Sequence, residues 1–146
     1  LGRRLMQRAV DELLLAEPDA TVAEVAAHLS ATFREFQLAP TRIAIRHGNP
    51  DAPARRVVVV HGALTNGGAE VARTYYEYGV DTVIYVHVTP SEVRKLQRGG
   101  RGHLIVTGHV AADSLGINAY LDTIEQLGVE VVRLNGIISP QDEEPL

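Results

Sequence analysis

The chain has 146 residues, a length that fits one domain with one hydrophobic core. Apolar residues make up 45% of it and charged residues 22%, the composition of an ordinary globular protein. Its formal net charge of -4 gives no broad basic field for a phosphate backbone, so we expect no nucleic-acid partner. The lack of cysteine excludes disulfides, thiolate zinc sites and cysteine nucleophiles. Any bound metal must therefore be held by histidine nitrogens and carboxylate oxygens.

The ends of the chain and its apolar runs bear on its location. No apolar run approaches the roughly 20 residues that a membrane-spanning helix needs, so we expect no membrane partner. No signal peptide is visible at Leu1-Gly2-Arg3-Arg4, and we expect a cytoplasmic protein. Because the first residue is not methionine, we expect the chain to be a processed or truncated piece of a longer protein.

The first part of the chain, residues 1–40, is predicted to be a short helical segment. Apolar side chains recur there at helical spacing, at Leu5, Met6, Val10, Leu13 and Leu14. Pro18 ends this first helix, because the residue before a proline avoids the helical region. The sequence from Thr21 to Glu24 has the form of a capping box and predicts the start of a second helix.

Beyond residue 41 the pattern changes to that of an α/β domain over residues 41–140. Ile43 and Ile45 alternate with more polar neighbours, which predicts a half-buried strand. Continuous apolar runs then predict four strands buried on both faces, at 57–60, 82–86, 104–106 and 129–132. Predicted helices separate them, at 69–78, from Pro90 to about 98, and at 112–127.

This alternation of strands and helices predicts a mostly parallel sheet with covering helices. In the last helix we expect the larger apolar side chains to point inward, namely Ile117, Tyr120, Leu121 and Ile124. The acidic, proline-bearing tail at 141–146 is predicted to be frayed.

Three of the predicted buried strands run into a histidine, and these are His61, His87 and His109. Open parallel sheets bind ligands at the carboxyl ends of their strands, and neighbouring ends lie roughly 5 to 10 Å apart. Asp113 follows His109 by four residues and can direct a carboxylate to the same point. Nitrogen and oxygen donors of this kind suit zinc, manganese or iron.

Simpler interpretations of the same residues stay open. Each histidine has about even odds of being only a hydrogen-bonding residue at a polar rim. Asp113 taken alone is more often a helix cap than a ligand. The glycine-rich loop at 62–68 could cradle an anion, but a tight strand-to-helix turn is favoured. Ser114 could suggest a hydrolase nucleophile, yet the Gly-x-Ser-x-Gly motif lacks its first glycine here.

The segment from Thr107 to Asn118, with Gly108-His109 and Asp113, resembles the Ngg-one-interacting-factor-three-like (Nif-three-like) family. These are dinuclear-metal α/β proteins, and some bacterial members are labelled as type-two homologues of GTP cyclohydrolase one. The resemblance extends over residues 57–88 and 128–138. It implies that His109 and Asp113 are ligands of a divalent metal ion, with up to two ions in the centre. Many members have glutamate where this chain has Asp113.

The family also has an upstream half with a His-His-Pro motif that supplies further ligands, and this motif does not occur here. The chain therefore resembles the C-terminal half alone. His61, His87 or a partner chain would have to complete the metal site. The resemblance further implies a ring-shaped homo-oligomer, often a hexamer in this family, and leaves the substrate unknown.

Three functional hypotheses follow from these observations. The first is a metal-dependent hydrolase in which bound metal activates water, with His87 or His61 completing the shell or moving a proton. The second is a non-catalytic metal-binding or regulatory module. The third is a structural or oligomerising scaffold, a fragment with an incomplete metal site. Bound metal separates the first two from the third, and metal-dependent turnover separates the first from the second.

Overall fold

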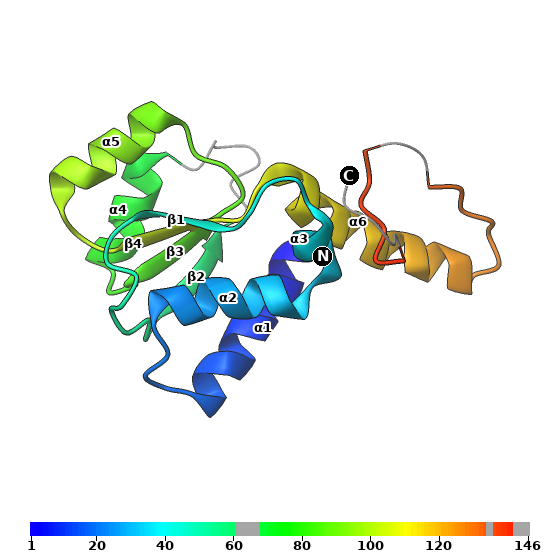
Figure 1. Cartoon of the computed structure of the whole chain (residues 1–146), viewed down its shortest axis with the longest axis horizontal. Coiled ribbons are helices and arrows are strands. Elements are labelled where there is room, and N and C mark those ends of the chain that lie inside the picture. Colours follow the sequence, from blue (N-terminus) through cyan, green and yellow to red (C-terminus); the bar gives the residue numbers. More distant parts are fainter. Residues whose placement is uncertain (61–67, 134–135, 142–146) are drawn as a thin grey trace.

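The computed structural model describes residues 1–60, 68–133 and 136–141. Its helices are α1 (Gly2–Ala16), α2 (Val22–Thr32), α3 (Arg34–Leu38), α4 (Ala69–Glu77), α5 (Pro90–Gly99) and α6 (His109–Gln126). Its strands are β1 (Ala44–His47), β2 (Val57–Val60), β3 (Thr82–Tyr85) and β4 (His103–Val106). The predicted mixed α/β class, with helices leading into the sheet, is confirmed (Figure 1).

The four strands form one sheet in the order β1-β4-β3-β2. β2, β3 and β4 are parallel, so their carboxyl ends meet at one edge of the sheet. β1, the strand predicted around Ile43 and Ile45, is antiparallel to β4 and pairs Ala44 with Val106. The start of β1 therefore lies beside the carboxyl end of β4, where the candidate site is expected.

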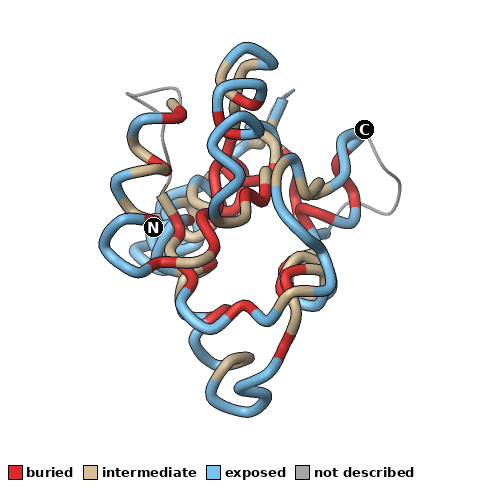
Figure 2. The backbone as a smooth tube through the Cα atoms, turned by 90° about the vertical axis from the view of Figure 1, so that its left-hand side faces the viewer, coloured by how far each residue is buried: buried red, intermediate tan, exposed pale blue. Residues whose placement is uncertain are grey.

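The sheet separates two hydrophobic clusters, because successive side chains of a strand point to opposite faces. One cluster joins alternate strand residues such as Val59, Ile84 and Ile105 to apolar residues of α1, α2, α3 and α6. The other joins Val83 and Leu104 to α4 and α5. The result is a layer of helices on each face of the sheet, with the buried residues concentrated between the layers (Figures 1 and 2).

The start of α2 has the capping box that the sequence predicts. The Thr21 hydroxyl accepts a hydrogen bond from the Glu24 amide at 3.2 Å, and the Glu24 carboxylate accepts one from the Thr21 amide at 2.7 Å. Two backbone donors of the first turn are thereby satisfied, at a stabilisation of about 1 kcal/mol.

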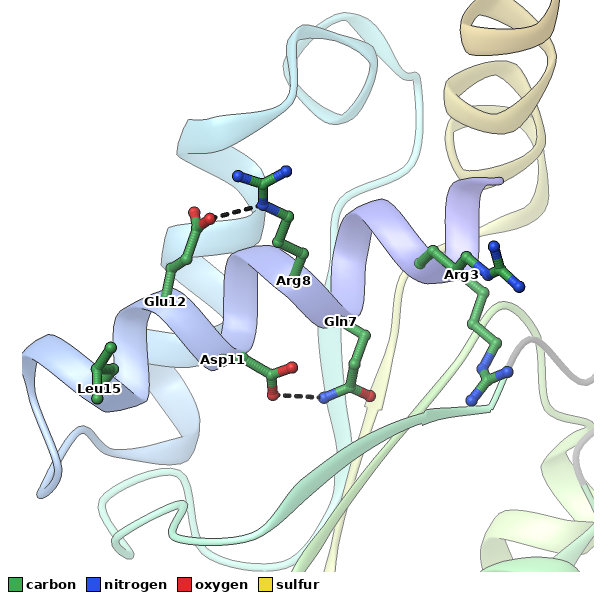
Figure 3. Close-up of a pocket in the computed structure, with 7 residues that line it drawn as sticks. Arg3, Gln7, Arg8, Asp11, Glu12 and Leu15 are labelled. Carbon is green, nitrogen blue, oxygen red and sulfur yellow. Dashed lines mark hydrogen bonds and ion pairs between the residues drawn. The ribbon is translucent and has the colours of Figure 1, made fainter.

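Side chains of α1 cover the free edge of β2. The Gln7 amide accepts a hydrogen bond from Val59 N–H at 2.8 Å and donates one to the Val57 carbonyl at 3.2 Å. The Arg3 Nε donates to the Val59 carbonyl at 2.9 Å. Figure 3 shows these polar side chains reaching from α1 toward the strand. Arg3 and Gln7 also line a surface hollow along α1. Their side chains hold the helix to the sheet.

The prediction of a fourth buried parallel strand at 129–132 is wrong. These residues form no strand, and Val129 and Val132 are 54% and 70% exposed. β1 takes the sheet position beside β4, and the chain after α6 turns away from the sheet (Figure 1). The apolar run therefore has no strand partner to pair with.

The prediction for the inward face of the last helix is also corrected. α6 begins at His109, three residues earlier than expected, and Ile117 and Tyr120 are exposed. Its buried residues are instead mostly small or polar, namely Ala111, Ala112, Ser114, Leu115 and Asn118. The reason is close backbone packing: a Cβ at Gly116 would lie 3.1 Å from the backbone nitrogen of Gly2 in α1.

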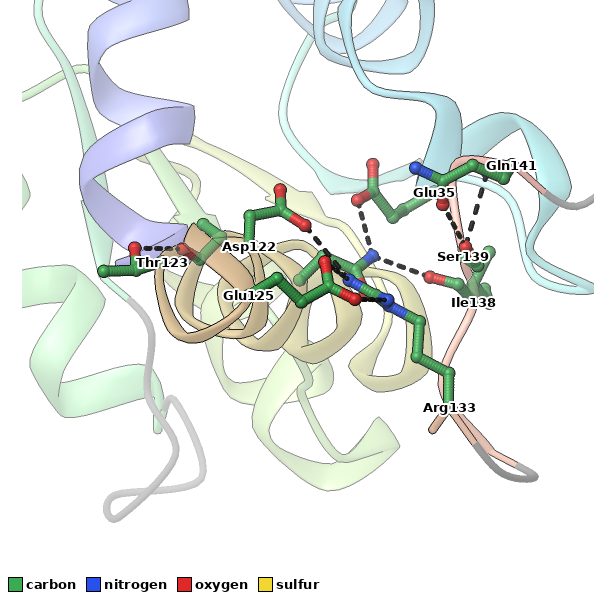
Figure 4. Close-up of polar contacts among 10 residues, drawn as sticks. Glu35, Asp122, Thr123, Glu125, Arg133, Ile138, Ser139 and Gln141 are labelled. Carbon is green, nitrogen blue, oxygen red and sulfur yellow. Dashed lines mark hydrogen bonds and ion pairs between the residues drawn. The ribbon is translucent and has the colours of Figure 1, made fainter. Parts of the chain in front are cut away.

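Buried polar contacts tie the end of the chain to this inner face of α6 (Figure 4). The Asn118 Nδ2 donates to the Glu35 carboxylate at 2.9 Å and to the Ile138 carbonyl at 2.8 Å. The Ser114 Oγ accepts a hydrogen bond from Ile138 N–H at 2.9 Å. Hydrogen bonds therefore replace the apolar contacts that the sequence pattern predicts for this helix.

Several expectations concern residues that are not described. His61, the glycine-rich loop through Gly67 and the tail at 142–146 lie outside the described residues. None of the described helices has the length and apolar character needed to cross a bilayer.

Candidate metal site

Two of the predicted histidines lie together at the carboxyl edge of the sheet. The neighbouring strands β3 and β4 pair Tyr85 with Val106, and His87 and His109 follow these residues by two and three positions. Their ring centroids are 5.3 Å apart, with an interplanar angle of 35°. This proximity follows from the parallel register, since adjacent strands end at the same level.

Gly108 makes the turn from β4 into α6 that presents His109. Its φ of +90° belongs to the region that side chains other than glycine rarely adopt. Its amide donates to the Val86 carbonyl at 2.9 Å, which holds the turn against the residue that follows β3. A Cβ at this position would lie 2.8 Å from the Thr41 Oγ1, so the close approach of Thr41 also requires glycine.

His109 and Asp113 face each other one helical turn apart on α6. The His109 Nδ1 lies 3.3 Å from the Asp113 Oδ2, and the two side chains are 50% and 45% exposed. The N-cap of α6 is Gly108, five residues before Asp113, so Asp113 lies inside the helix. The alternative interpretation of Asp113 as a helix cap is therefore wrong.

The donor set is compatible with part of a metal shell. Two ligands of a tetrahedral zinc-type ion lie roughly 3.4 Å apart, close to the separation of the His109 and Asp113 donor atoms. A carboxylate can equally orient a ligating histidine by accepting its second ring N–H. Within residues 1–60, 68–133 and 136–141, no group of three or more histidine or acidic side chains is placed to hold an ion. The described residues thus offer a pair of donors with His87 beside them.

A hollow of about 380 Å³ opens beside the two histidines. Its lining comes from β1 and the ends of β3 and β4, and consists of Thr41, Arg42, Ala44, Arg46, Val86, His87, Val88, Val106, Gly108, His109 and Val110. Sequence reasoning did not assign Thr41, Arg42 or Arg46 to the site. The available signal was the alternation along residues 42–46, which places the two arginines on the side opposite Ile43 and Ile45.

Ser114 is not available as a nucleophile in this arrangement. It is 1% exposed, and its hydroxyl oxygen accepts a hydrogen bond from the Ile138 amide. Its position on the inner face of α6 gives it a structural role.

His103 lies at the opposite end of β4 and takes no part in the site. Burial lowers its pKa, and His47 lowers it further, while Asp81 acts in the opposite direction. The His103 Nδ1 accepts a hydrogen bond from the Asn49 amide at 3.1 Å, which a protonated nitrogen could not do. This histidine therefore stabilises the turn before β2 in its neutral form.

No protein-family model and no curated protein matches the sequence. Among solved structures, the chain is similar to a NIF3 superfamily protein from Sphaerobacter thermophilus, with a TM-score of 0.84 and 47% identity. The match covers 92% of this chain and 49% of that protein, so the chain spans about half the length of this relative.

Two crystal structures of the Staphylococcus aureus protein SA1388 are also similar, both at 14% identity. Their TM-scores are 0.53 and 0.55, over 79% and 87% of this chain and 32% and 39% of that protein. At this identity the likeness shows the fold alone. The match to the Sphaerobacter protein, in contrast, confirms the resemblance that the sequence predicts, and the chain is a relative of the NIF3 superfamily.

Proposed function

We propose that this chain is a metal-binding protein of the NIF3 type, in which His109 and Asp113 hold a divalent cation and His87 stands beside them. The observation that carries the proposal is the 3.3 Å separation of the His109 and Asp113 donor atoms at the carboxyl edge of a parallel sheet. Zinc, manganese and iron suit this combination of imidazole and carboxylate.

The described donors are too few for a closed shell, so the proposal includes further ligands. His61 follows β2, which lies beside β3 at the same edge of the sheet, and is the first candidate in this chain. A second copy of the chain is the other candidate source of ligands. A centre with two ions would need ligands from that second copy.

As an enzyme, the protein would be a metal-dependent hydrolase of unknown substrate. A bound divalent ion would lower the pKa of a water molecule and supply the nucleophile. His87, 5.3 Å from the His109 ring, would then accept or donate a proton beside that water. Metal-dependent turnover of a hydrolysable substrate would separate this activity from a non-catalytic metal-binding role.

The His109→Ala variant tests the metal site. We expect near-stoichiometric metal in the purified wild-type protein and loss of at least about nine-tenths of it in the variant, because an imidazole ligand is removed. Elemental analysis by mass spectrometry measures the metal content. The matched control is His28→Ala, which removes a histidine of α2 whose ring nitrogen lies 3.3 Å from the Thr32 hydroxyl. Full metal occupancy in His109→Ala, or equal loss in His28→Ala, would exclude this site.

A scaffold that assembles copies of itself is the second candidate function, and the surface of α6 favours it. Of the large apolar side chains exposed in the described residues, six lie on α6 and the segment after it: Val110, Ile117, Tyr120, Leu127, Val129 and Val132. Such a concentration of apolar surface is typical of an interaction site. We propose a second copy of the chain as its occupant, consistent with the homo-oligomer implied by the family resemblance.

The Tyr120→Glu variant tests this assembly. We expect the wild-type protein to sediment as an oligomer and the variant to shift toward the monomer, because a charge in an apolar interface is costly to bury. Sedimentation velocity measures the mass. Leu15→Glu is the matched control, since Leu15 is 85% exposed on α1, away from this surface. A monomeric wild type, or an oligomer untouched by Tyr120→Glu, would contradict the proposal.

A further inference from the structure

The only side chains with a fixed charge among the lining residues of the hollow beside the histidine pair are two arginines. Arg46 lies in β1 and Arg42 two residues before that strand, while His87 follows β3 and His109 begins α6. No aspartate or glutamate is among its lining residues, although the whole chain has a formal net charge of -4. Cationic side chains are thus gathered at this point against the overall charge of the protein, which favours an anionic ligand.

The two arginines are suited to hold such an anion. They line the same hollow from β1 and the segment just before it, with Ala44 between them. The Arg42 Nη1 donates to the Gln37 carbonyl at 2.8 Å, which fixes the direction of this guanidinium. For Arg46, the described part of the chain provides neither an acidic partner nor a hydrogen bond. Guanidinium groups bind the oxygens of phosphate and carboxylate with paired N–H donors.

Neutral donors complete the polar side of the hollow. Thr41 contributes a hydroxyl group, held close to the backbone of Gly108. α6 begins at His109 and has no side-chain cap. The amide groups of its first turn therefore point toward the end of the helix that borders the hollow. These groups add to the arginines and do not define the site alone.

The remaining wall is apolar and indicates that the ligand has an organic part. Ala44, Val86, Val88 and Val106 form this wall. The volume of about 380 Å³ is at the lower end of the range for small-molecule sites. Free phosphate would leave this apolar surface uncovered.

We propose that this hollow binds a small phosphorylated organic molecule, with its phosphate held by Arg42 and Arg46 and its organic part against the valine wall. A phosphate monoester carries a charge of about -1.5 to -2 at neutral pH, which two arginines balance better than they balance a single carboxylate. The inference names the substrate class for the metal site proposed above, and it rests on that proposal only in treating the ligand as a substrate.

Calorimetric titration of the metal-free protein, kept in a chelator, tests the inference. The probes are phenyl phosphate, inorganic phosphate and benzoate. We expect phenyl phosphate to bind at least about tenfold more tightly than either of the others, since only this probe uses both the cationic and the apolar parts of the lining. Equal binding of benzoate, or no binding of phenyl phosphate, would overturn the proposal.

The Arg46→Gln variant assigns the binding to this hollow. It should weaken phenyl phosphate binding by about tenfold or more, the loss expected for a charge-assisted pair. Arg94→Gln makes the same change of net charge at an exposed position of α5 outside the hollow and should leave the affinity within about twofold. Equal effects of the two variants would mean that only net charge matters, and would overturn the site.

The titration and the metal analysis fail independently. If the metal-free protein binds phenyl phosphate but His109→Ala keeps its metal, the phosphate site stands and the metal site falls. If the metal depends on His109 but phenyl phosphate does not bind, the reverse holds.

Discussion

Replacing Gly102 with alanine is expected to destabilise the protein by about 2 to 5 kcal/mol. Gly102 has a φ of +75°, and a Cβ there would lie 2.4 Å from the ring of Tyr76. The ring has little freedom to move, because Tyr76 is buried in the core and its hydroxyl donates to the His103 carbonyl at 2.8 Å. Both backbone strain and overpacking therefore oppose the substitution.

Urea unfolding followed by circular dichroism measures this loss. Gly100→Ala is the matched control, because Gly100 also has a positive φ, +64°, but has no atom within 4 Å of an added Cβ. We expect a cost of about 1 to 2 kcal/mol for the control, which is the conformational contribution alone. If the two variants lose the same stability, the contact with Tyr76 does not constrain this turn.

The Asn118→Asp variant is expected to lose about 2 to 4 kcal/mol of stability. In the wild-type protein the Asn118 amide donates to two buried acceptors, the Glu35 carboxylate and the Ile138 carbonyl. The substitution keeps the side-chain shape but replaces this donor with an acceptor. Two acceptors then lose their partner, and a second carboxylate is buried against Glu35, which is 4% exposed.

A double-mutant cycle separates this effect from a general loss of packing. Glu35→Gln supplies an amide donor that can bond to the new carboxylate, so the double variant should recover part of the stability lost by Asn118→Asp. The Ile138 carbonyl stays unpaired, and recovery should therefore be incomplete. Additive losses in thermal and urea unfolding would mean that the contact between residues 35 and 118 contributes nothing specific.

The layered fold could be predicted because its signals are local. The apolar runs at 57–60, 82–86 and 104–106 are β-branched and short, and helical patterns separate them, so their parallel pairing follows. The run at 129–132 has the same local pattern but no sheet position left to occupy. Which of these runs becomes a strand depends on tertiary pairing, and a single sequence segment carries no information about that pairing.

The candidate site could be predicted in part for the same reason. His87 and His109 lie together because parallel strands end at one level, and their proximity follows from the strand order alone. Arg42 and Arg46 could not be placed, since they reach the site only through the antiparallel addition of β1 to β4. On α6, apolar spacing predicted the wrong face because hydrogen bonds of Ser114 and Asn118 compensate the burial of polar groups.

The contacts between α1 and β2 also limit how this protein can associate. The Gln7 amide bonds to Val57 and Val59 on either side of Val58, which is how a residue of an added parallel strand would pair. A foreign strand cannot extend the sheet at β2 without first displacing this side chain and Arg3. Growth of the sheet from chain to chain, the usual route to aggregation, is thereby blocked at the β2 edge.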